Sequence, residues 1–122
     1  MVEPFSLFCL IIQKEEFNEN GGEKMEVIYE IFGETLKVRL PKEVDHCNSI
    51  DIRKEADKRI YSGKVKNIEF DFADTSFMDS SGIGMIMGRY KLIKPLGGKI
   101  ILTGVSGNIE RIIKVSGVYR LL

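Results

Sequence analysis

The stretch that decides the fold is KNIEFDFADTSFMDSSGIGMIMGRYKLIKPLGGKIILTG, residues 66–104. Its first part, 66–74, alternates apolar and charged side chains, which is typical of a strand with one buried face. Residues 81–94 place apolar side chains at helical spacing, and a proline and a glycine pair end this pattern before a second apolar run at 99–104. This order predicts a helix that crosses over between two parallel strands.

The flanking segments extend the pattern in both directions. Residues 27–41 alternate like a hairpin with its turn at Gly33, and residues 49–63 predict a helix that Ser49 caps and Gly63 ends.

Downstream, we expect Ser106 to cap a third helix that ends at Gly117, and residues 118–122 resemble the start of another strand. The expected order is therefore ββαβαβα(β), an α/β fold with helices packed on a sheet.

The first 24 residues differ from the rest of the chain. Their apolar part carries Glu3 where a secretory signal would carry basic residues, and no small-residue cleavage site follows, so we reject a signal peptide. Two interpretations remain. Translation starts at Met25, or residues 1–24 form an N-terminal extension that is disordered or adds a helix. In both cases the predicted domain spans residues 25–122.

Composition argues against several classes of protein. The chain has 18 basic and 18 acidic residues, and this balance favours neither nucleic acid nor an anionic membrane as a partner. No apolar run approaches the roughly 20 residues that span a bilayer. The two cysteines, Cys9 and Cys47, are far apart, so a disulfide framework or a zinc site is not indicated. We expect a cytoplasmic protein in a reducing compartment.

The segment FMDSSGIG, residues 77–84, invites a catalytic interpretation that the chain does not support. A serine hydrolase would have to use His46, the only histidine, and the glycine that precedes the serine of a nucleophile elbow is missing. The glycines Gly82, Gly84 and Gly88 match neither a dinucleotide-binding motif nor a P-loop. We expect Gly84 and Gly88, four residues apart, to allow close helix packing, and we expect no catalytic residue and no cofactor.

Two further interpretations concern the same region. Asp71, Asp74 and Asp79 lie near one strand end and could hold Mg²⁺, but capping explains Asp79 equally well, and we predict no metal site. If Asp79 caps the helix, the hydroxyl of Ser80 is left to face outward, where a kinase can reach it. The alternative is that this serine merely starts the helix, and local physics leaves the two about equal.

Several motifs together resemble a known family. They are FMDSSG (77–82), GRYK (88–91), the Gly97-Gly98 turn, SGNIERIIKVSG (106–117) and the acidic EVD (43–45). Over about residues 25 to 122 the chain resembles the STAS-domain anti-sigma factor antagonists, most of all those that act on the anti-sigma F factor during sporulation. The resemblance implies a STAS-like mixed sheet with helices packed on it.

The resemblance also implies a function in transcription regulation, and not an enzyme. Ser80 would be phosphorylated by the partner, an anti-sigma factor that is also a serine kinase using ATP. The unphosphorylated form would bind that kinase and release the sigma factor, and a phosphoserine phosphatase would reset the cycle. The implied partner contacts surround Ser80: Asp45, Thr75, Ser76, Met78, Asp79, Ser81, Gly82 and Arg89.

Two alternatives stay open, namely an antagonist in a general stress-response pathway and a STAS scaffold unit without a phosphorylation cycle. Two departures from the family also stand out. Pro41 and Lys42 precede the EVD turn where the family usually has a glycine, so the loop beside the site is expected to differ. The family continues beyond the position of Leu122 with the rest of a strand and a helix, which suggests a C-terminal truncation.

Overall fold

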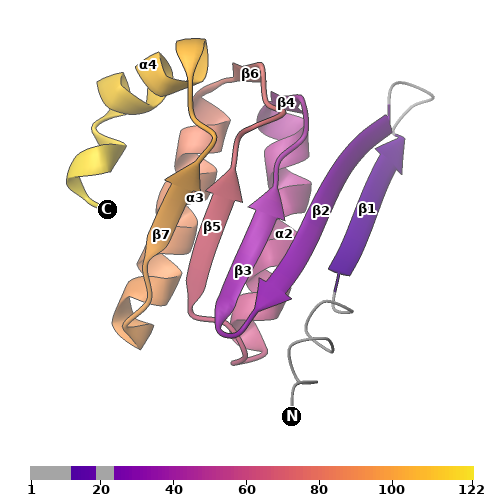
Figure 1. Cartoon of the computed structure of the whole chain (residues 1–122), viewed down its shortest axis with the longest axis vertical. Coiled ribbons are helices and arrows are strands. Elements are labelled where there is room, and N and C mark those ends of the chain that lie inside the picture. The colour runs from indigo at the N-terminus through magenta and orange to yellow at the C-terminus, as the bar shows by residue number, and fades with distance from the viewer. Residues whose placement is uncertain (1–11, 19–23) are drawn as a thin grey trace.

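A mixed five-stranded sheet forms one layer of the fold, and helices cover one of its faces (Figure 1). The computed structural model describes residues 12–18 and 24–122. The strand order is β1-β2-β3-β5-β7, in which β1, β2 and β3 are antiparallel neighbours while β3, β5 and β7 run parallel. The strands are β1 (Ile12–Asn18), β2 (Lys24–Phe32), β3 (Thr35–Arg39), β5 (Asn67–Asp71) and β7 (Ile100–Thr103).

Two long helices pack behind the sheet and a third lies at one end of it (Figure 1). These are α2 (His46–Tyr61), α3 (Ser80–Ile93) and α4 (Gly107–Ser116), with short 3₁₀ turns η2 (Lys94–Leu96) and η3 (Val118–Arg120). None of the helices in the described ranges is both long and apolar enough to cross a membrane.

The strand alternation in the sequence sets which face is buried. Leu36 and Val38 on β3 and Ile68 and Phe70 on β5 are fully buried against the helices. The residues between them point to the other face, since successive side chains on a strand alternate. The predicted hairpin, crossover helix and parallel strands are therefore confirmed.

Three local expectations differ from the structure. Helix α2 begins earlier than expected: Asp45 is its N-cap and accepts a hydrogen bond from the amide of Asn48, at 2.9 Å, while Ser49 is buried inside the first turn. Residues 118–120 form η3 and not a strand, because the left-handed Gly117 (φ 81°) reverses the chain after α4. Part of the N-terminal segment, residues 12–18, is a strand paired with β2.

A separate two-stranded sheet joins the segments that precede the two long helices. Strand β4 (Glu43–Val44) pairs in parallel with β6 (Phe77–Met78), and the amide of Asp79 donates to the carbonyl of Val44 at 3.2 Å. Asp45 and Asp79 follow these paired strands directly. The two helix N-termini consequently lie side by side, separated by about the strand spacing of 5 Å.

Gly82 allows the start of α3 to pack closely on this small sheet. A Cβ added there would lie 2.4 Å from the buried Met78 side chain and 3.2 Å from Val44. At Gly84 and Gly88 an added Cβ would meet no described atom within 4 Å. The expectation that Gly84 and Gly88 provide close packing is therefore wrong, and Gly82 has that role.

Alanine substitutions at Gly82 and Gly84 should change stability in opposite directions. Gly82→Ala must displace Met78, at a cost of about 1–3 kcal/mol that the better helix propensity of alanine only partly offsets. Gly84→Ala should stabilise the fold by about 0.5–1 kcal/mol, because it only reduces the entropy of the unfolded chain. Thermal and urea unfolding of both variants measures this, and equal shifts for the two would contradict the packing argument.

An ion pair ties the two long helices together. Arg89 on α3 is 5% exposed, and its Nε lies 2.8 Å from Oδ1 of Asp57 on α2. Burial lowers the pKa of the Arg89 guanidinium below its ordinary value, and the charge of Asp57 opposes this shift. The pair fixes α2 and α3 relative to each other at a buried position.

Removing the carboxylate of this pair should destabilise the domain more than removing an exposed charge. Asp57→Ala leaves a buried, uncompensated guanidinium, and because the Asp57 side chain is a quarter exposed we expect a loss of about 2–3 kcal/mol, below the range for fully buried pairs. Lys58→Ala, which removes a neighbouring surface charge, should change stability by less than about 0.5 kcal/mol. Urea unfolding of both variants measures the free energy of unfolding. Similar small losses for the two variants would show that the ion pair does not stabilise the domain.

Candidate functional site

The hydroxyl of Ser80 is presented at the start of α3. Asp79 is the N-cap of this helix, and its carboxylate accepts a hydrogen bond from the amide of Ser81 at 2.8 Å. Ser80, the first helical residue, is exposed, whereas Ser81 is half-buried. The cap bond uses the backbone of Ser81. Within the described structure no hydrogen bond engages the hydroxyl of Ser80. The predicted cap at Asp79 is confirmed.

A second capped helix flanks this serine. Asp45 has the same backbone conformation as Asp79 (φ −106°, ψ −172°), because each follows a strand of the β4–β6 pair. The side-chain amide of Asn48 donates to the carbonyl of Glu43 at 2.8 Å and closes the turn before α2. The structure thus brings Asp45 close to Asp79 and Ser80, three of the residues that the family resemblance placed around the site.

The loop before β6 is held by the segment that departs from the family pattern. The hydroxyl of Thr75 donates to the carbonyl of Pro41 at 2.8 Å, and the amide of Ser76 donates to the carbonyl of Lys42 at the same distance. Ser76 is exposed and Thr75 is half-buried. Both carbonyls are backbone acceptors, so this anchoring does not require a glycine at either position.

Three predicted contact residues face the interior. Met78 is 1% exposed, Gly82 is buried against it, and Arg89 is held between α2 and α3. Gly82 and Arg89 therefore do not lie on an open surface: Gly82 packs on Met78 and Val44, and Arg89 pairs with Asp57 farther along α3. Met78 reaches the surface only as part of the floor of a groove.

That groove lies beside Ser80 and was not predicted from the sequence. It has a volume of about 480 Å³ and runs between the start of α3 and the outer side of α4. Most of its lining is apolar. The residues are Met78, Asp79, Ser80, Ile83, Arg111, Ile112, Val115 and Ser116.

The apolar residues of α4 indicate part of this groove in the sequence. Ile112 and Val115 lie next to the buried stripe of α4, Ile109 and Ile113, and widen it beyond what packing on the sheet requires. Val115 is 82% exposed, and Phe77 on β6 is 45% exposed. Exposed apolar side chains next to an apolar groove are typical of a surface that binds a partner.

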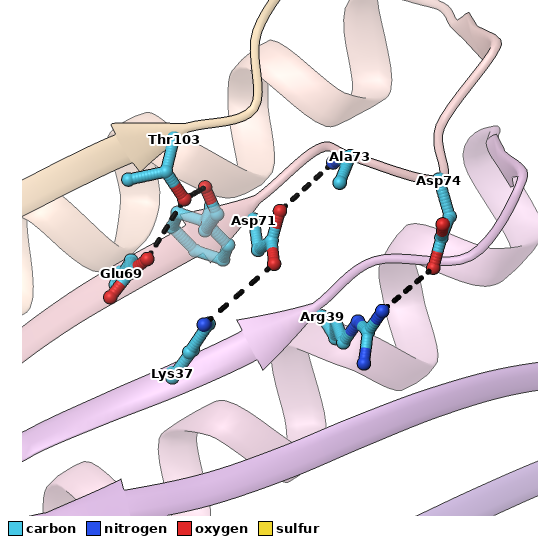
Figure 2. Close-up of polar contacts among 8 residues, drawn as sticks. Lys37, Arg39, Glu69, Asp71, Ala73, Asp74 and Thr103 are labelled. Atoms are coloured by element: carbon cyan, nitrogen blue, oxygen red, sulfur yellow. Dashed lines mark hydrogen bonds and ion pairs between the residues drawn. The ribbon is translucent and has the colours of Figure 1, made fainter.

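The acidic residues considered for a metal site have cationic partners instead. Figure 2 shows Asp71 between Lys37, at 3.9 Å, and the amide of Ala73, at 2.9 Å, and Asp74 beside Arg39, at 3.6 Å. Asp71 ends β5 and Asp74 lies in the turn that follows, while Asp79 caps α3. In the described ranges no three acidic, histidine or cysteine side chains gather as metal ligands would.

His46 is the first residue of α2 and is exposed. Its backbone carbonyl accepts a hydrogen bond from the hydroxyl of Ser49 at 3.0 Å. His46 therefore lies at the entry to α2.

Comparisons with known proteins agree with this geometry. The anti-sigma F factor antagonist of Paenibacillus polymyxa is 37% identical over 87 residues, which cover 71% of this chain and 74% of that protein. The structure of the anti-sigma factor antagonist SpoIIAA in its unphosphorylated form matches with a TM-score of 0.72 at 33% identity, over 75% of this chain and 81% of that one. The phosphorylated form of Bacillus SpoIIAA matches with a TM-score of 0.66 at 33% identity, over 77% and 86%.

The STAS domain family model matches residues 25–122. This range coincides with the domain that the sequence predicts. It contains both capped helix N-termini, Ser80 and the groove. The chain belongs to the STAS domain family.

Proposed function

We propose that this protein is an anti-sigma factor antagonist of the sporulation type, which binds an anti-sigma factor and thereby releases a sigma factor. The observation that carries the proposal is the exposed Ser80 at the capped start of α3, next to the capped start of α2 and at the edge of an apolar groove. The relative in Paenibacillus polymyxa and SpoIIAA bear the name of such an antagonist. The protein acts in the cytoplasm, where sigma factors meet RNA polymerase.

The finer proposal is a switch on Ser80. The anti-sigma factor is also a serine kinase: the γ-phosphoryl group of ATP is transferred to Oγ of Ser80, ADP leaves, and the hydroxyl proton passes to the kinase. A phosphatase hydrolyses the phosphoserine and restores the binding form. In this cycle the protein is a binder and a substrate, and it performs no catalysis of its own.

The position of Ser80 suits a switch that acts through the surface. A phosphoserine carries a charge of about −1.5 to −2 at neutral pH. The positive end of the α3 dipole favours an anion by about 0.3–2 kcal/mol, so the fold itself tolerates the modification. A hundredfold loss of partner affinity requires about 2.8 kcal/mol, which a dianion buried against a partner readily supplies.

The test of the switch is phosphorylation by an anti-sigma F factor kinase with ATP, followed by location of the phosphate by mass spectrometry. We expect one phosphate on Ser80, none in Ser80→Ala, and normal incorporation in Ser81→Ala, which keeps the backbone cap bond. Phosphate on Ser81, or on neither serine, would overturn the proposed site. An antagonist of a stress pathway would be modified only by its own kinase, and a scaffold unit by neither.

Binding of the unphosphorylated protein to the same kinase should depend on the exposed apolar residues beside Ser80. Truncating Phe77 or Val115 to alanine should weaken binding about five- to thirtyfold, as expected for side chains at the centre of an interface. Leu96→Ala is the matched control, because this leucine is 52% exposed but lies beyond the far end of α3.

Calorimetry or surface plasmon resonance measures these affinities, and circular dichroism confirms folding. A loss for Leu96→Ala equal to the other two would show that the contact surface lies elsewhere.

A further inference from the structure

Arg111 on α4 lines the same groove as Ser80, although the two residues are 31 positions apart in the chain. Its neighbours on the helix, Glu110 and Lys114, pair with each other at 3.5 Å. Within the described part of the chain Arg111 itself has no ion-pair or hydrogen-bond partner. An unpaired guanidinium therefore lines the same groove as the serine that the proposed cycle modifies.

We propose that Arg111 is the internal counter-ion of a phosphate on Ser80, an inference that rests on the phosphorylation proposed above. Guanidinium groups recognise phosphate oxygens through two parallel N–H donors, and they do so better than a lysine ammonium. The long side chain of Arg111 can lay its methylene groups along Ile112 and Val115 of the groove while its charged end stays in water.

The surrounding charges explain why a cation is needed here. Asp79 lines the groove, and Asp45 stands beside it at the start of α2. A phosphate dianion on Ser80 therefore joins two carboxylates, and like charges this close repel one another. The cationic groups on the facing helix are Arg111 and Lys114, and Glu110 already engages Lys114. Arg111 is thus the cation of α4 that remains for the phosphate.

The pairing assigns a second consequence to phosphorylation. A phosphate held by Arg111 lies over the mouth of the groove, above Ile83 and Val115. Modification then covers the apolar surface that the unphosphorylated protein offers to its partner, in addition to placing negative charge there. Phosphorylation would thus weaken partner binding in two ways, by charge repulsion and by covering the apolar groove.

The test uses the full chain with phosphoserine installed at position 80 during synthesis, so that no kinase is required. The second pKa of the phosphate is measured by a ³¹P NMR titration in wild type, Arg111→Gln, Arg111→Lys and Lys91→Gln. A nearby cation favours the dianion and lowers this pKa from its usual value of about 6. Arg111→Gln should raise it by about half a pH unit, and Arg111→Lys should restore part of the difference.

Lys91→Gln is the matched control. It removes the same charge from α3, about 16 Å along the helix from Ser80, beyond the screening length of about 8 Å at physiological salt. Its phosphate should titrate as in the wild type. An unchanged pKa in Arg111→Gln, or an equal rise in Lys91→Gln, would overturn the pairing. Because the phosphate is installed chemically, this result is independent of whether a kinase modifies Ser80.

Discussion

The site depends on the pairing of two very short strands. Val44 lies opposite Met78 in the β4–β6 pair, and the two segments come from parts of the chain 34 residues apart. Since each strand leads directly into a helix, their pairing places the first turns of α2 and α3 next to each other. The acidic turn and the serine motif face the same solvent region only for this reason.

The helices must also hold their relative position further along. The Arg89–Asp57 ion pair joins the second halves of α2 and α3, and the absence of a side chain at Gly82 lets the start of α3 approach Met78 and Val44. A buried ion pair adds little net stability compared with an apolar pair, but it accepts only one geometry. Two helices fixed at two points present their N-termini with little freedom, which suits recognition by a partner.

The sequence was informative where structure is local. The alternation at residues 67–71 and the cap at Asp79 need only a few neighbours, and both were predicted. The start of α2 was missed because Ser49 and Asp45 are both good capping residues, and the choice depends on strand pairing far along the chain. The groove joins α3 to α4, and no periodicity within one segment could reveal it.

Arg89 illustrates a different kind of error. The family resemblance implied that it contacts the partner, yet Met85, Arg89 and Ile93 follow one another at four-residue intervals on the buried face of α3. The apolar residues Met85 and Ile93, four positions to either side, are the local sign that position 89 lies on this face. Charged residues are rarely buried unless they are paired, and the partner, Asp57, lies on another helix.

The charges around Ser80 also restrict how any modification there can act. The helix dipole favours a phosphate by an amount similar to the repulsion expected from two partly solvated carboxylates. These terms roughly cancel in the free protein, and the exposed Arg111 adds only the small attraction of a solvated ion pair, so the modification changes the balance between folded and unfolded states little. In a complex the partner removes water from the same charges, and each interaction becomes several times stronger. Phosphorylation can therefore change the affinity for a partner strongly while it changes the stability of the domain little. A switch that must not unfold its own domain requires this combination.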